Sequence, residues 1–270
     1  MCSYVHRCHL HSMKQSTLIA NIMRAYYSKI LSGASLPTSP FSFHSIQKAP
    51  SNSKIIHLVR HAEGTHNVEK KYKAEEHLDA PLTNVGIKQC TTFSEEIATK
   101  LNNIECIVTS PMTRAIQTAQ FCFDDHINNG QVPFVACEEW RETVNYLCDV
   151  RRETSYLRDE FPKLNFEHIQ HETDPIWDYY KAIYGTQDDF GQLRELADLD
   201  SLKVRCRAAL DFIIKREEKE IAIVSHSALF YHLFNSFDDS LVKFEDDAVE
   251  SLMKDRFENC EVRSIAIQVN

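Results

Sequence analysis

Strand-sized apolar runs alternate with longer amphipathic stretches along most of this chain, and that alternation limits its fold more than any other feature. Apolar runs of this length, and one closing segment of alternating pattern, predict strands at 55–59, 104–108, 221–224 and 262–269. Apolar residues at helical spacing predict helices at 83–101, 112–123, 199–218 and 228–234. Strands separated by helices indicate an α/β fold, a three-layer sandwich in which helices cover both faces of a mostly parallel sheet. The less regular stretch 138–191 is expected to be an inserted lid region.

The N-terminal part differs in composition from the rest of the chain. Residues 1–62 contain seven Lys and Arg but no Asp or Glu, and apolar residues recur at roughly helical spacing over 17–31. A basic, acid-free, Ser-rich and amphipathic segment is typical of an organelle transit peptide, and the alternative is an unstructured tail without an address. We therefore predict a disordered or targeting extension over 1–52 and one domain over 53–270. The expected location is intracellular, either cytoplasmic or mitochondrial.

The charge balance and the cysteines exclude several classes of protein. Since seven of the 30 Lys and Arg lie in residues 1–62, 23 remain beyond them against all 39 Asp and Glu. Nucleic-acid binding depends on clustered positive charge, so we expect no nucleic acid as partner. No run approaches the ~18 consecutive apolar residues that span a bilayer, so we expect no membrane association either. Nine cysteines without a C-x-x-C pair predict reduced thiols.

Charged side chains follow three of the predicted strands. Arg60 and His61 follow the first strand, Arg114 opens the helix after the second, and His226 follows the third. Ligands of parallel α/β sheets bind beyond the carboxyl ends of the strands, so we expect these side chains to lie together. Guanidinium groups match phosphoryl oxygens, and a neutral imidazole attacks phosphorus. The sequence therefore predicts a site for a small phosphorylated substrate that uses no metal and no cofactor.

Four sequence motifs occur in one order along the chain. They are L-V-R-H-A-E-G-T-H-N at 58–67, P-L-T at 81–83 with Gly86, S-P-M-T-R-A-I-Q-T-A at 110–119, and V-S-H-S at 224–227. Together they resemble the histidine phosphatase superfamily, also called the phosphoglycerate-mutase-like family, over about 54–270. The middle segment is similar to a eukaryotic branch of mutase-like proteins without an assigned substrate. The resemblance implies an α/β sandwich around a mixed sheet.

The resemblance also implies a role for each matched residue. His61 would accept the phosphoryl group as the nucleophile, and Arg60, Arg114 and His226 would clamp it. Asn67 would support the same pocket through its side-chain amide.

The proton donor of the family is a Glu in a short segment after the third strand. Trp140-Arg-Glu-Thr matches that segment, which makes Glu142 the expected donor, and Glu138 and Glu139 remain alternatives. Glu142 would protonate the leaving oxygen and then activate the water that hydrolyses phosphohistidine, which requires a carboxyl with a suitable pKa.

The same motifs bear on the type of reaction. Glycolytic phosphoglycerate mutases carry a Trp before the Asn of the first motif, whereas this chain has Gly-Thr-His before Asn67. We therefore predict a phosphomonoester hydrolase that acts through a phosphohistidine on His61. The alternatives are a phosphotransferase of the phosphoglycerate-mutase type and a non-catalytic phosphate-binding scaffold on the same fold.

Overall fold

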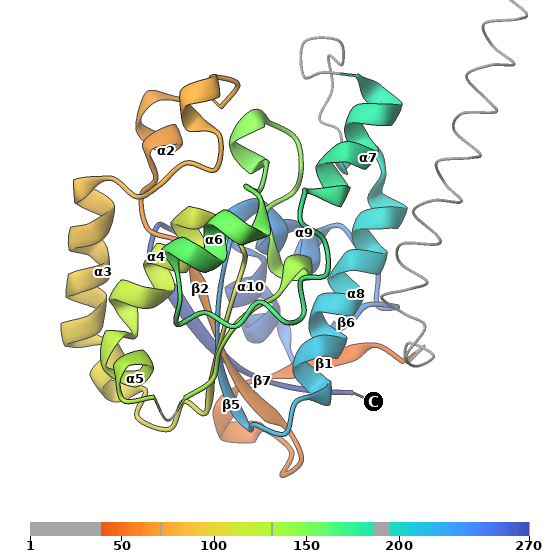
Figure 1. Ribbon diagram of the computed structural model, residues 1–270. Coiled ribbons are helices and arrows are strands. Elements are labelled where there is room, and N and C mark those ends of the chain that lie inside the picture. Colours follow the sequence, from red (N-terminus) through yellow and green to blue (C-terminus); the bar gives the residue numbers. More distant parts are fainter. Residues whose placement is uncertain (1–38, 71, 131, 186–194, 270) are drawn as a thin grey trace, which may run out of the picture.

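A seven-stranded sheet forms the centre of the computed structural model, which describes residues 39–70, 72–130, 132–185 and 195–269 (Figure 1). The strand order is β4-β3-β5-β2-β7-β1-β6, and all neighbours are parallel except β7, which runs antiparallel to β2 and β1. The strands are β1 Phe41–His44, β2 Lys54–Arg60, β3 Cys106–Thr109, β4 Phe134–Ala136, β5 Glu220–Ser225, β6 Val242–Phe244 and β7 Val262–Val269. The predicted α/β class with a mostly parallel sheet is confirmed.

Helices cover both faces of the sheet, with α3, α4 and α5 on one side and α8 on the other (Figure 1). Along β2, Ile56 and Leu58 join the core under α8 and α9, whereas Val59 joins the core under α3 and α4. This alternation follows from the period-2 direction of strand side chains. The α-helices are α2 Thr65–Glu69, α3 Asn84–Glu96, α4 Thr113–Cys122, α5 Asp124–Asn128, α6 Thr154–Glu160, α7 Pro175–Tyr184, α8 Leu199–Lys215, α9 Ser227–Asn235 and α10 Asp247–Lys254.

Local sequence signals explain where α3 begins. The Thr83 hydroxyl accepts a hydrogen bond from the Gly86 N–H at 2.9 Å, which satisfies one of the free donors at the helix start. The helix ends at Glu96, and a separate 3-10 turn continues to Lys100, so the α-helix is shorter than predicted. None of the helices in the described ranges is long and apolar enough to cross a bilayer.

The domain begins earlier than the predicted boundary at residue 53. Strand β1 lies between β7 and β6, and its Phe41 and Phe43 side chains are fully buried in the core. Residues 41–52 therefore belong to the domain, which corrects the predicted extension over 1–52. A four-residue strand between Pro40 and Pro50 is too short to stand out from the tail-like composition around it. The segment 17–31, predicted as part of a targeting signal, lies outside the described residues.

The predicted lid insertion folds through buried ion pairs. Arg141 lies 2.9 Å from the Glu138 carboxylate and donates two hydrogen bonds to Asp174, at 2.5 and 2.6 Å. Arg151 lies 3.0 Å from the second oxygen of Glu138. A buried charge is tolerated only when it is paired, so this network holds distant parts of the lid together.

Candidate active site

Three strand ends form the floor of the site. In the sheet, Arg60 of β2 is the register partner of Ser225 of β5, and Thr109 of β3 is paired with Val224 of β5. The His61 N–H then donates to the Ser225 carbonyl at 2.9 Å. The carboxyl ends of β2, β5 and β3 are therefore adjacent, and the residues that follow them lie at one edge of the sheet.

His61 is buried with its ring in one defined tautomer. Its Nδ1 lies 2.7 Å from the Ala62 carbonyl oxygen. Because a carbonyl only accepts, Nδ1 carries the proton and Nε2 keeps its lone pair. Burial and then the charge of Arg114 lower the pKa of His61 well below its usual value. The ring is therefore neutral at neutral pH, which is the form a nucleophile needs.

Two further imidazoles surround His61. The His226 ring centroid lies 5.0 Å and the His66 centroid 5.7 Å from that of His61. The His226 Nε2 is 2.8 Å from the Ser110 hydroxyl oxygen. Burial, with the charge of Arg114 next, lowers the pKa of His226 well below its usual value and that of His66 to about 2. The site thus holds three neutral rings, of which His66 is not among the predicted site residues.

The two predicted arginines border the same rings. Arg60 donates to the Phe257 carbonyl at 2.7 Å, and Arg114 donates to the Cys148 carbonyl at 2.8 Å. The Nε atoms of both guanidinium groups are buried and lack a hydrogen-bond partner within the described part of the chain. Buried donors are rarely left unpaired, so two free guanidinium donors around a neutral histidine suit the oxygens of a phosphoryl group.

The Glu142 carboxylate lies against the first turn of α9, the helix that begins directly after His226. One of its carboxylate oxygens accepts a hydrogen bond from the Leu229 N–H at 2.9 Å, and the other accepts from the Ala228 N–H at 3.3 Å. Burial and then the charge of Asp149 raise the pKa of Glu142. The carboxyl therefore keeps its proton to a higher pH than an exposed Glu does.

Glu139 and Glu138, the alternative proton donors, face other partners. The Glu139 carboxylate accepts a hydrogen bond from the Cys137 thiol at 3.1 Å, and the Glu139 backbone carbonyl accepts one from Arg205 of α8. Glu138 pairs with Arg141 in the lid network. Of the three acidic side chains, Glu142 is the one that accepts hydrogen bonds from α9, the helix that follows His226.

Asn67 holds the loop after His61 together. Its side-chain oxygen accepts from the Gly64 N–H at 3.0 Å, and its Nδ2 donates to the His66 Nε2 at 3.1 Å. The amide therefore orients His66 with one of its two N–H donors.

Two residues that contact the predicted site residues were not predicted from the sequence. Asp149 lies 3.3 Å from the Arg114 guanidinium, and Ser110 bonds to His226. Asp149 stands in the segment Cys148-Asp-x-Arg-Arg, but no spacing rule connects it with an arginine 35 positions earlier. Ser110 lies within a predicted motif, although only the sheet register reveals its partner.

A family comparison decides the classification of the chain. Residues 56–240 match the profile of the histidine phosphatase superfamily (branch 1). The chain belongs to this superfamily. The predicted resemblance is thereby confirmed. The matched range includes the predicted site residues Arg60, His61, Arg114, Glu142 and His226.

Proteins of known sequence and of known structure are similar to this chain. A phosphoglycerate mutase-like protein of Arabidopsis thaliana is 32% identical over 79% of this chain and 84% of that protein. A Schizosaccharomyces pombe protein named "Probable phosphatase" is 27% identical over 64% of this chain and 74% of that protein. The ecdysone phosphate phosphatase of Bombix mori, solved with tungstate, covers 78% of this chain and 88% of its own length, with a TM-score of 0.50 and 13% identity. The last likeness concerns the fold alone.

Proposed function

We propose that this member of the superfamily is a phosphomonoester hydrolase that forms a phosphohistidine on His61. The observation that carries the proposal is the tautomer of His61: Nδ1–H is bound to the Ala62 carbonyl, so Nε2 is the free nucleophilic atom of a neutral ring.

In the first half-reaction, Nε2 of His61 attacks phosphorus and the bond to the ester oxygen breaks. Arg60, Arg114 and His226 bind the non-bridging oxygens, whose charge needs stabilisation in the transition state. Glu142 delivers its proton to the leaving alcohol. The raised pKa of Glu142 supports this role because the carboxyl must be protonated when the substrate binds.

In the second half-reaction, the Glu142 carboxylate takes a proton from water, and the resulting nucleophile attacks the phosphohistidine. The P–N bond breaks, inorganic phosphate leaves, and both His61 and Glu142 return to their starting protonation states. The positive charge of the two arginines would serve where many phosphatases use a divalent ion, so we expect activity to persist in excess chelator.

A trapping experiment tests the intermediate. Wild-type protein is mixed briefly with a ³²P-labelled phosphomonoester and quenched in alkali, which preserves phosphohistidine. Label should appear on the wild type, be absent from His61→Ala, and accumulate in Glu142→Gln because water is no longer activated. Glu139→Gln is the matched control and should behave as wild type. Label that persists in His61→Ala would contradict the assignment of the nucleophile.

A second assay separates hydrolysis from phosphotransfer. A phosphatase releases inorganic phosphate and admits water to the phosphohistidine, whereas a mutase must protect it until the phosphoryl group is returned. We expect phosphate release from p-nitrophenyl phosphate and from phosphoserine without 2,3-bisphosphoglycerate. Interconversion of phosphoglycerates that depends on 2,3-bisphosphoglycerate, with little phosphate release, would identify a mutase instead. Binding of inorganic phosphate without either reaction would identify a scaffold.

A further inference from the structure

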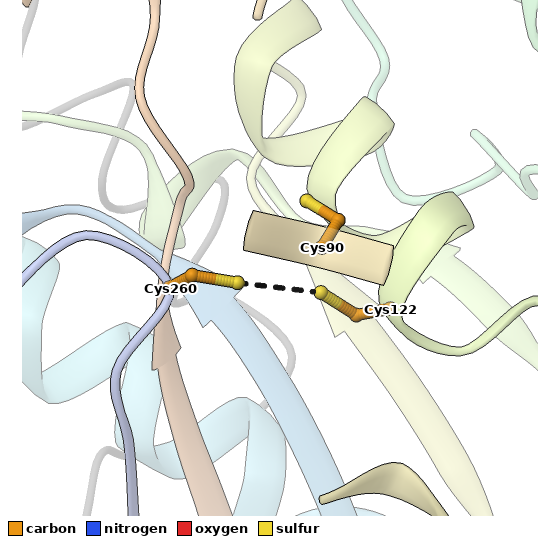
Figure 2. A group of neighbouring side chains, drawn as sticks. All are labelled: Cys90, Cys122 and Cys260. Atoms are coloured by element: carbon orange, nitrogen blue, oxygen red, sulfur yellow. Dashed lines mark hydrogen bonds between the residues drawn. The ribbon is translucent and has the colours of Figure 1, made fainter. Parts of the chain in front are cut away.

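Three buried cysteines lie together behind the nucleophile loop. Cys90 belongs to α3, Cys122 ends α4, and Cys260 precedes β7. Their sulfur atoms all lie within 4.8 Å of one another, and the Cys122 and Cys260 side chains point toward each other with their sulfurs 3.6 Å apart (Figure 2). The proposed hydrolysis uses none of them.

The backbone at Cys260 is unusual for a residue with a side chain. Its φ is 60°, in the left-handed region that favours glycine. Such a conformation costs free energy and persists only where the surrounding structure enforces it. Cys260 adopts this conformation in a turn that also contacts His61, and its thiol points toward Cys122.

The cluster is linked directly to the main chain of the nucleophile. The Cys260 N–H donates to the carbonyl oxygens of Arg60 at 3.1 Å and His61 at 3.4 Å. The Asn259 side chain donates to the same His61 carbonyl at 3.0 Å. A displacement of the Cys260 turn would therefore move the backbone of Arg60 and His61.

A cavity borders the cluster at Cys122. It lies where α3 and the turn after it face α5, with a volume of about 250 Å³, and Ser94, Asn102, Cys122 and His126 are among the residues that line it. Cys122 is the cluster member at this cavity. Hydrogen peroxide or a small alkyl hydroperoxide fits such a space, whereas a protein reductant does not.

We propose that Cys122 and Cys260 are a redox modification site, in which a hydroperoxide converts the two thiols into a disulfide that lowers the activity of His61. The effect on activity rests on the proposed function, whereas the disulfide does not.

The chemistry uses Cys90 as a proton acceptor. The Cys90 sulfur lies within 4.8 Å of both other sulfurs, and hydrogen bonds from the Cys122 and Cys260 thiols lower the pKa of Cys90, so Cys90 is the thiol that loses its proton most readily. With Cys90 deprotonated, the Cys122 sulfur attacks the terminal oxygen of the hydroperoxide while its proton passes to Cys90. An S–O bond forms, the O–O bond breaks, and the alkoxide leaves as an alcohol with the proton from Cys90. Cys122 is now a sulfenic acid.

The second step forms the cross-link. Cys260 passes its proton to Cys90, and the Cys260 thiolate attacks the Cys122 sulfur. The S–S bond forms, the S–O bond breaks, and hydroxide leaves as water with the proton from Cys90. Two thiols and one hydroperoxide thus give one disulfide, one alcohol and one water, and Cys90 is unchanged.

The surroundings favour a disulfide over a bound metal ion. All three cysteines belong to the apolar core between the sheet and helices α3 and α4. A three-thiolate metal site requires all three thiols to be deprotonated at once, which places three negative charges in this apolar core. A disulfide is uncharged, so it suits an apolar setting.

Closing the bond requires a movement at the nucleophile. The sulfurs must approach from 3.6 Å to about 2 Å, and the turn that carries Cys260 must absorb part of that change. Misplacement of a reacting group by about 1 Å is enough to slow an enzyme on the order of 100-fold. We therefore expect oxidation to reduce kcat for p-nitrophenyl phosphate at least about tenfold, with full recovery after dithiothreitol.

Peptide mapping of the full-length protein tests the disulfide without any substrate. Reduced protein is exposed to hydrogen peroxide, alkylated, digested without reductant and examined by mass spectrometry. Wild type and the control Cys206→Ala, altered in the core under α8, should both yield one peptide pair that joins Cys122 to Cys260. Cys260→Ala should yield none, and Cys90→Ala should form the link more slowly. Cys122 and Cys260 that remain alkylatable, or a metal ion that co-purifies with the cluster and blocks the link, would overturn the proposal.

Activity measured on the same samples tests the regulatory effect. Wild type and Cys206→Ala should lose activity reversibly, whereas Cys260→Ala should keep its activity under peroxide. A complete cross-link with unchanged kcat would overturn the regulatory half of the proposal. If reduced wild type hydrolyses no phosphomonoester, the proposed function fails, while the peptide map still decides whether the disulfide forms.

Discussion

The imidazole Nε2 of His226 lies 2.8 Å from the hydroxyl oxygen of Ser110, although 116 positions separate the two residues in the chain. Ser110 follows β3 and His226 follows β5, so their contact joins two neighbouring strand ends. Both side chains are fully buried. The hydroxyl therefore determines the orientation of a ring that we assign to phosphate binding.

Ser110→Ala is expected to lower kcat/KM for p-nitrophenyl phosphate about tenfold, since loss of a buried hydrogen-bond partner costs ~1–3 kcal/mol. Steady-state kinetics and a thermal melt measure the effect on activity and on stability. Ser264→Ala is the matched control because it removes the hydroxyl 2.7 Å from the ring of His57, another buried histidine outside the site. Equal losses of activity in the two variants would show that Ser110 has no special relation to the site.

The pH dependence of kcat/KM should reflect two opposite pKa shifts. His61 must be neutral, and its pKa is lowered, so it stays competent into the acid range. Glu142 must be protonated, and its raised pKa extends activity upward before the rate falls as pH rises through that value. Glu142→Gln should abolish this alkaline decline. Asp149→Asn should move the decline to lower pH, because the negative charge of Asp149 raises the pKa of Glu142. A decline unchanged in Glu142→Gln would assign it to another group.

Gly86→Ala should weaken both folding and activity. A Cβ at this position would lie 2.2 Å from the carbonyl oxygen of Glu63, two residues after His61, so the loop must shift. Overpacking of this kind costs ~1–3 kcal/mol of unfolding free energy. Urea denaturation and kinetics should show losses in both quantities. Gly130→Ala is the control: its φ of 66° disfavours Ala, but the space is open, so stability should fall while kcat stays unchanged.

Removal of residues 1–52 should destabilise the domain, whereas removal of residues 1–38 keeps every described strand. The longer deletion takes away β1, whose Phe41 and Phe43 are fully buried between the sheet and its helices. Loss of one buried Phe side chain alone costs ~3–5 kcal/mol, a large share of the ~5–15 kcal/mol that stabilises a domain. Chemical denaturation of the two variants beside the full chain measures the difference. Equal stability of both variants would mean that β1 contributes little.

Local patterns in the sequence were sufficient for the elements of the site. The apolar run before Arg60 and the run before His226 predict β2 and β5, and both strands end where the charged residues begin. Thr83 predicts the start of α3 because a cap bonds within its own turn. These signals act over a few residues, so they are visible in the chain itself.

Only the tertiary structure decided which distant residues meet. The contact of Glu142 with the start of α9 distinguishes it from Glu139, and the sulfur of Cys122 approaches that of Cys260 across 138 positions. Strand β1 also depends on the tertiary structure, since its four residues form a strand only when β7 and β6 supply hydrogen-bond partners. The short strands β1, β4 and β6 were not predicted. The sequence by itself therefore determined the fold class and the order of the strands and helices that it predicted, and it supplied the residues that we propose for the chemistry, because these signals depend on contacts within one turn or strand. The partners of those residues depend on the sheet register and on core packing, which exist only after the whole chain has folded.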